Sequence, residues 1–85
     1  MMMKVFAIRD VKSGFLNPTV EMSDDIAVRN FEHAIQCTSK DSLFFTHASD
    51  YALYAIGEYD TDSGQILGFD VPRLLLQADA VKVGE

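Results

Sequence analysis

The sequence predicts an α+β protein: a four-stranded antiparallel sheet in ββαββ order, with one main helix on one face and a short C-terminal element. Three observations support this fold class. Residues 51–71 are typical of a β-hairpin, because a polar turn with one glycine separates two apolar runs. Residues 24–37 carry apolar side chains at helical spacing. Residues 4–22 hold two shorter apolar runs around a turn signal, which predicts a second hairpin.

Alternation predicts the N-terminal hairpin. In residues 4–10, KVFAIRD, apolar side chains fall on both faces of an extended chain. A turn at residues 12–14 leads into a brief second strand over residues 15–22. Pro18 restricts that strand to a sheet edge, because proline has no N–H group to donate to a neighbour.

The main helix is expected from Asp24 to Cys37. Ser23 is the candidate N-cap, and the two acidic residues that follow it favour the positive end of the helix dipole. Apolar residues at three- and four-residue spacing form one stripe along this helix, which would pack on the sheet. Residues 42–50 then predict a loop or a single helical turn.

The C-terminal half begins with the strongest strand of the sequence, at residues 51–59. A four-residue connection follows, in which Gly64 is expected to take a positive φ. Three further segments are expected after it: a return strand at 65–71 that Pro72 stops, a segment of helical composition at 73–78, and an alternating tail at 80–83 that could add an edge strand.

Length and cysteine content limit what this chain can be. Its 85 residues predict one domain spanning residues 1–85. A chain of this size buries only about 60–65% of its unfolded surface, so self-association is an expected aid to stability. The single cysteine excludes an internal disulfide, and with two scattered histidines it makes a poor zinc-ligand set. We therefore expect no metal and no cofactor.

Charge and hydropathy limit the kinds of molecule that this chain is expected to bind. Seven basic and thirteen acidic residues give a net charge of −6, which repels phosphates at long range and disfavours tight duplex binding. Stacking of unpaired bases and binding of a basic protein both stay open. No apolar run reaches the roughly 18 residues of a membrane span, and no signal-peptide core is present. A cytoplasmic location without membrane contact is expected.

One helix can cover only one face of the predicted sheet, although the strands carry large apolar groups on both faces. An uncovered apolar face usually marks an interface, so we expect a homodimer or a higher oligomer. The alternative is that the C-terminal segment folds back over that face. Besides the sheet surface, two short segments are candidate interfaces, with these residues: Phe44, Phe45, Leu74 and Leu75.

Motifs for catalysis and metal binding are weak. The Asp60-x-Asp62-x-Gly64 spacing resembles the opening of a calcium loop, but the required later glycine and glutamate are missing, which favours a plain hairpin turn. His33 and Cys37 are four residues apart on the helix, where a half-buried thiol is the simpler interpretation than a nucleophile pair. We expect no catalytic residues and no enzymatic activity.

Aromatic residues on the predicted strands form the one pattern with a functional shape. A sheet that displays aromatic rings beside cations can stack unpaired bases, while the alternative role of these rings is to fill the core and a dimer seam. The candidate nucleic-acid-binding residues are Lys4, Arg9, Lys12, Tyr54 and Tyr59.

Nearly the whole chain resembles a known viral family. The matching stretches are KVFAIRDVKSGFLNP, DDIAVRNFEHAI and DYALYAIGEYDTDSGQI, the last with tyrosines around an acidic strand end and an Asp-Ser-Gly turn. They are similar to the small nonstructural protein of gokushoviruses, which are single-stranded-DNA microviruses of bacteria. The resemblance implies a DNA-binding protein of the host cytoplasm that acts in viral DNA replication, or at the switch to single-strand production and packaging. It implies no catalytic residues.

Two functional hypotheses follow. The first is a non-enzymatic phage module that binds single-stranded DNA through strand aromatics and nearby cations. The second is an interaction module that binds the phage replication initiator or a host factor through acidic and apolar surface, with Asp60 and Asp62 as candidate contacts.

Overall fold

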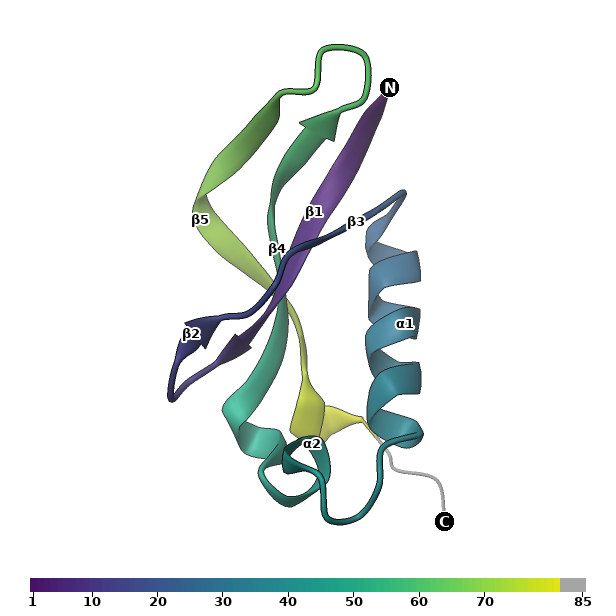
Figure 1. The fold of residues 1–85 in the computed structure, drawn as a ribbon, viewed down its shortest axis with the longest axis vertical. Coiled ribbons are helices and arrows are strands. Elements are labelled where there is room, and N and C mark those ends of the chain that lie inside the picture. The colour runs from purple at the N-terminus through teal and green to yellow at the C-terminus, as the bar shows by residue number, and fades with distance from the viewer. Residues whose placement is uncertain (82–85) are drawn as a thin grey trace.

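The computed structural model describes residues 1–81 and confirms the α+β class (Figure 1). Three strands precede the main helix, and two more strands and the short helical turns follow it. Their order and bounds are β1 (Met2–Asp10), β2 (Gly14–Phe15), β3 (Thr19–Glu21), α1 (Asp24–Gln36), α2 (Leu43–Thr46), the 3₁₀ turn η1 (Ala48–Asp50), β4 (Tyr51–Asp60), β5 (Ile66–Gln77) and the 3₁₀ turn η2 (Ala78–Ala80).

Within residues 1–81 the sheet has five strands, one more than expected. The order is β2-β1-β4-β5, β3 also pairs with β1, and every pairing is antiparallel. The stretch 15–22, expected to be one brief strand, is divided into β2 and β3. Leu16, Asn17 and Pro18 separate the two, and Pro18 has no N–H group for the ladder.

The helix α1 begins where the sequence predicts. The Ser23 hydroxyl accepts a hydrogen bond from the Ile26 N–H at 3.3 Å, and Ser23 itself is extended, as an N-cap should be. The helix ends at Gln36, with Cys37 as its C-cap. The thiol of Cys37, expected to be half-buried, is exposed, because the helix buries a different stripe. No helix of residues 1–81 is long and apolar enough to cross a membrane.

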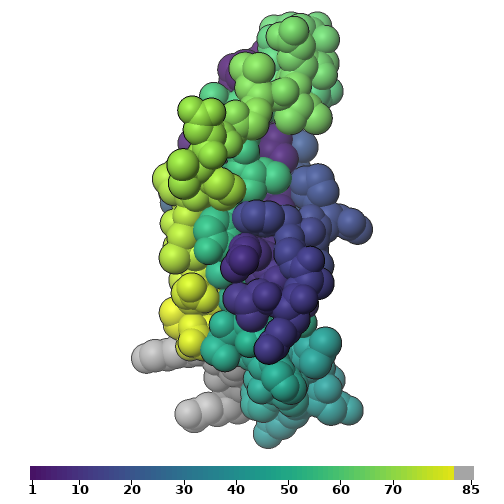
Figure 2. Space-filling model, turned by 90° about the vertical axis from the view of Figure 1, so that its left-hand side faces the viewer, coloured from purple at the N-terminus to yellow at the C-terminus, as the bar shows by residue number. Residues whose placement is uncertain are grey.

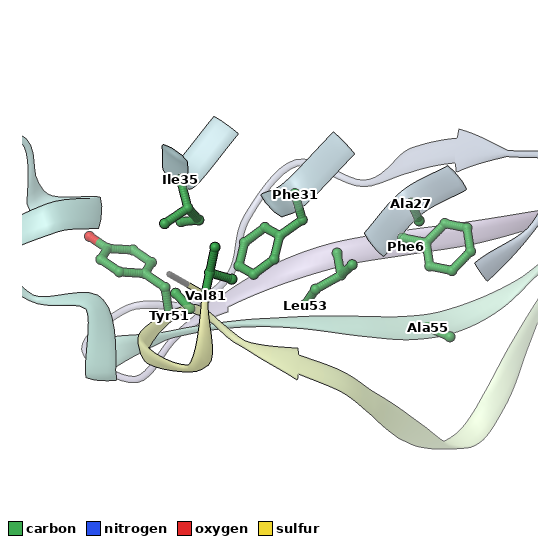
Figure 3. Packing of buried hydrophobic residues seen from close by; sticks show 9 residues of the cluster. Phe6, Ala27, Phe31, Ile35, Tyr51, Leu53, Ala55 and Val81 are labelled. Atoms are coloured by element: carbon green, nitrogen blue, oxygen red, sulfur yellow. The ribbon is translucent and has the colours of Figure 1, made fainter. Parts of the chain in front are cut away.

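The core lies between α1 and one face of the sheet. Figure 3 shows Phe6, Leu53 and Tyr51 projecting from β1 and β4 toward Phe31 and Ile35 of the helix. Phe6 and Ile35 are fully buried. Burial raises the pKa of the Tyr51 phenol, with a further contribution from the neighbouring carboxylates, so this ring stays uncharged within the core.

The strand β5 departs most from expectation. The return strand does not stop at Pro72, and the expected helical segment at 73–78 is mainly strand through Gln77. Ala55 pairs with Arg73 and Gly57 pairs with Gly68, so the four residues 69–72 lie opposite Ile56 alone. We call residues 69–72 the bow. This bulge lifts Pro72 out of the ladder, and the strand resumes beyond it.

Two shorter segments, residues 42–50 and 80–81, can also be compared with their predicted structure. The 42–50 stretch folds as the short helix α2 followed by η1, which agrees with the single-turn alternative. In the expected tail at 80–83, Ala80 belongs to the 3₁₀ turn η2 and Val81 is buried in the core cluster. The last two residues of that expected tail lie outside the described residues.

The close approach of β4 and β5 generates a stability prediction. A Cβ atom at Gly57 would lie 2.4 Å from the Leu67 carbonyl oxygen, which is main chain and cannot move without opening the ladder. Gly57→Ala should therefore lower the free energy of unfolding by about 1–3 kcal/mol. Chemical denaturation measures this change.

Gly68→Ala is the matched control. Gly68 pairs directly with Gly57, yet a Cβ atom there would meet nothing within 4 Å. This variant should change the free energy of unfolding by no more than about 0.5 kcal/mol. Equal losses in the two variants would contradict the close-approach explanation.

Candidate nucleic-acid interface

One face of the sheet has no helix over it, and we call it the open face. It faces away from α1, and strand alternation and register assign its residues. They are Met3, Val5, Ala7 and Arg9 of β1, Phe15 of β2, Val20 of β3, Ala52, Tyr54 and Tyr59 of β4, and Ile66 and Leu74 of β5. Figure 2 shows this side of the molecule, with β5, β4 and the N-terminal hairpin next to one another.

The open face leaves part of an apolar sheet surface exposed. Phe15, Leu74 and Ile66 are 46%, 47% and 67% exposed, whereas Val5, Ala7 and Ala52 of the same face are buried. The alternative, a C-terminal segment folded over this face, does not hold for the described residues. Val81 packs with Phe31 and Ile35 on the helix side of the sheet.

Two aromatic rings and a cation meet at one end of the open face. The rings of Phe15 and Tyr54 contact edge to face, with centroids 5.5 Å apart and planes at 82°. Arg9 lies between Phe15 and Ala52 in the strand register. With Lys12 at the adjacent hairpin tip, Arg9, Phe15 and Tyr54 form what we call the aromatic–cation cluster.

The hairpin sequence explains how the cluster is assembled. The Asp10 carboxylate accepts hydrogen bonds from the Lys12 N–H at 2.9 Å and from the Ser13 hydroxyl at 3.2 Å. Gly14 then takes a φ of +115°, which L side chains rarely adopt. This tight reversal exposes Lys12 and returns Phe15 directly opposite Arg9.

Two of the five predicted binding residues lie elsewhere. The Lys4 side chain is on the helix side, where its Nζ lies 3.6 Å from Asp24 Oδ1, and Arg73 donates to the same carboxylate at 3.0 Å. Lys4 is therefore engaged in joining the start of α1 to the sheet. Tyr59 is on the open face but at the opposite end, between Met3 and Ile66.

Phe15 is the residue that sequence reasoning missed as part of this site. Its aromatic ring on a predicted strand was the available signal. Only the pairing of Phe15 with Arg9 and its contact with Tyr54 show that it belongs to the cluster.

The four predicted interface residues are also divided by the fold. Phe44 packs on Tyr51, with ring centroids 4.9 Å apart, and Leu75 packs against the core cluster. Phe45 is 36% exposed on α2. Leu74 lies on the open face, opposite Tyr54 in the register. These four side chains therefore do not form one surface.

The acidic turn between β4 and β5 is built as a hairpin connection. Gly64 has a φ of +77°, as expected. Hydrogen bonds from the Asp62 N–H at 2.9 Å and the Ser63 hydroxyl at 3.0 Å lower the pKa of Asp60. Within residues 1–81 no group of three or more His, Cys, Asp or Glu side chains is arranged to hold a metal ion.

Two other features of the described residues are chemically notable. His33 and Cys37 approach to 3.6 Å between Nδ1 and Sγ, and both are exposed. A cavity of about 170 Å³ opens between α1 and the β3 side of the sheet, with Asn30 and Glu21 hydrogen-bonded at its rim. Among residues 1–81, Glu21 is the one titratable residue that lines the cavity.

Comparison with known proteins identifies a phage family. Residues 3–81 match the sequence profile of the family described as Phage ORF5 protein. The comparisons with curated proteins and with solved structures gave no match.

The lowered pKa of Asp60 generates a pH prediction. Because the folded pKa lies below the unfolded value, Asp60 stabilises the fold above about pH 4, and this contribution disappears as pH falls through the folded value. Asp60→Asn should therefore lower the melting temperature near neutral pH and show a smaller further decrease on acidification. Melting temperatures measured across this pH range test the expectation.

Ser63→Ala serves as the graded comparison, because it removes one donor to Asp60 and leaves the Asp62 N–H in place. Its acid sensitivity should lie between those of the wild type and Asp60→Asn. An unchanged acid sensitivity in Asp60→Asn would show that the turn carboxylate does not contribute.

Proposed function

Because the chain belongs to the Phage ORF5 protein family, we propose that it is a non-enzymatic nonstructural protein of gokushovirus-type microviruses that binds single-stranded DNA. It would act in the cytoplasm of the bacterial host, in viral DNA replication or at the switch to single-stranded genome production and packaging. The single observation that carries the DNA-binding proposal is the aromatic–cation cluster on the open face.

Stacking supplies the attraction in this proposal. Phe15 is 46% exposed and contacts Tyr54 edge to face, so one face of its ring is held in place for an unpaired base. Each base stacked on an aromatic side chain contributes about 1–3 kcal/mol in single-strand binding proteins. Bases inside a duplex are already stacked on each other, so this mode selects single strands.

Electrostatics support a modest contribution from phosphates. Arg9 and Lys12 are the two cations of the cluster, and among residues 1–81 the register places no other charged residue than Arg9 on the open face. Two neutralised phosphates predict a salt dependence of log K on log[salt] with a slope of about −1.4 for a single strand. A shallow slope of this kind is compatible with a net charge of −6.

A protein partner is the second candidate function. Asp62 is 86% exposed at the tip of the β4–β5 turn, where its carboxylate accepts a hydrogen bond from the N-terminal amine of Met1 at 2.8 Å and stays open to a basic surface on its other sides. Asp60 accepts the hydrogen bonds that organise the turn, so the charge reversal is made at Asp62, where it also removes the ion pair with the N-terminal amine. If this function holds, Asp62→Lys should reduce co-purification of the phage replication initiator or a host replication protein from infected cells. A pull-down with the wild-type chain that contains no replication protein would contradict this function.

The test of DNA binding is a titration of fluorescent oligothymidine with the full chain at low and moderate salt. Tyr54→Ala should weaken binding about tenfold, because losing one stacking partner costs about 1.4 kcal/mol. Lys12→Glu should weaken binding as well and should make the salt dependence shallower, because one phosphate contact is lost.

Lys40→Glu is the matched control for Lys12→Glu, because it introduces the same charge change at an exposed lysine in the loop after α1. It should leave the affinity close to that of the wild type. Equal weakening by the two reversals would mean that net charge, and not the cluster, sets the affinity. No binding of the wild type at low salt would exclude the proposal.

A further inference from the structure

The cavity between α1 and the β3 side of the sheet has the form of a small binding site. Its volume is about 170 Å³, and small side chains create it, because Ala27 and Ala34 of α1 leave room next to Leu53 of β4. Figure 3 shows Ala27 and Phe31 facing Leu53 across this layer. In another protein, an engineered apolar cavity of about 150 Å³ binds benzene, so the space here is that of one aromatic ring.

Hydrogen-bonding side chains lie around the apolar interior of this cavity. They are Asn17 in the loop before β3, Thr19 and Glu21 of β3, and Asn30 of α1. Asn30 Nδ2 donates to Glu21 Oε2 at 3.3 Å, which holds these two side chains next to each other. A carboxylate has acceptor sites for about four hydrogen bonds, so Glu21 keeps capacity for a ligand. An apolar interior with a few polar groups is the usual form of a site for a small organic molecule.

These polar groups define the edge of the ring that fits. The ionised carboxylate of Glu21 only accepts hydrogen bonds, whereas the Asn17 carboxamide and the Thr19 hydroxyl can also donate them. The matching ring therefore has an amino group beside acceptor atoms. Cytosine has this edge, because its exocyclic amine donates, its ring nitrogen and carbonyl oxygen accept, and carboxylates are suitable acceptors for that amine. Thymine places a carbonyl oxygen where cytosine has the amine, and this oxygen would face the carboxylate.

Size and polarity disfavour the other occupants of this cavity. A purine has two fused rings and exceeds a space that suits one ring. An apolar side chain of a protein partner would fill the interior, but it would offer no hydrogen-bond partner to the carboxylate, the amides and the hydroxyl around it. A neutral base also avoids the repulsion that a chain of net charge −6 exerts on a phosphate.

From these observations we propose that the cavity is a binding site for a cytosine ring, in which Glu21 accepts a hydrogen bond from the exocyclic amine. Free deoxycytidine and an unpaired cytosine in a single strand both offer this ring. The cavity lies on the helix side of the sheet, whereas the aromatic–cation cluster lies on the open face. The inference therefore goes beyond the proposed function and does not rest on it.

The experiment is an NMR titration of the full chain with deoxycytidine and, separately, with thymidine, following the side-chain amide signals of Asn17 and Asn30. Deoxycytidine should shift these signals saturably and bind at least about fivefold more tightly than thymidine, because one hydrogen bond to a charged group distinguishes the two bases. Titration with oligodeoxycytidine identifies the source of the ring: the same shifts indicate a base within a strand, and their absence indicates the free nucleoside.

Two variants test the residues that form the site. Ala34→Leu fills the cavity and should abolish binding of deoxycytidine, while circular dichroism should show an intact fold, because Ala34 is exposed and leucine favours helices. Glu21→Gln keeps the size of the side chain and should remove the preference for deoxycytidine over thymidine. Glu32→Gln is the matched control, because it removes the same charge from α1 outside the cavity, and it should keep the preference.

The cavity and the aromatic–cation cluster can be tested separately. Tyr54→Ala should bind deoxycytidine as the wild type does, and Ala34→Leu should bind oligothymidine as the wild type does. Four results would each overturn the cytosine site: no saturable shift with deoxycytidine, equal affinity for thymidine, tighter binding of p-cresol as a mimic of a protein side chain, or unchanged deoxycytidine binding by folded Ala34→Leu.

Discussion

The structure depends on one constraint: its sheet is apolar on both faces, and the chain supplies a single long helix to cover them. The stripe of Ala27, Phe31 and Ile35 lies over Phe6, Leu53 and Tyr51, and this layer is the core. Covering that side also places the start of α1 against the sheet, where Asp24 meets Lys4 and Arg73. The second side is left with exposed rings and aliphatic groups, and the proposed single-strand binding uses them.

The junction of β4 and β5 divides this exposed surface into two parts. At Gly57 the two strands approach so closely that a methyl group would not fit. One residue further along, the bow carries β5 away from its neighbour. Beyond the bow, β5 returns to the sheet and places Leu74 opposite Tyr54. The strand β5 thus contributes Leu74 to the aromatic surface at one end and leaves the ladder at the bow before pairing again with β4 at the other.

An acidic chain can still contact a nucleic acid when its cations are concentrated locally. Here Arg9 and Lys12 are close to two aromatic rings, whereas Lys4 and Arg73 are both paired with the carboxylate of Asp24. The carboxylates of the β4–β5 turn belong to the other end of the sheet. Membership in a phage protein family supports a viral process, and the arrangement of these charges indicates which end of the molecule would take part in it.

The sequence by itself determined the elements that depend on local chemistry. Ser23 as N-cap, positive φ at Gly64, the periodicity of α1 and the alternation of β1 and β4 all follow from short-range geometry. Tertiary structure decided which side chains meet, because alternation assigns a residue to a face without identifying its cross-strand neighbour. Register therefore placed Phe15 beside Arg9, turned Lys4 toward Asp24, and allowed β5 to continue past Pro72 once the bow had removed that residue from the ladder.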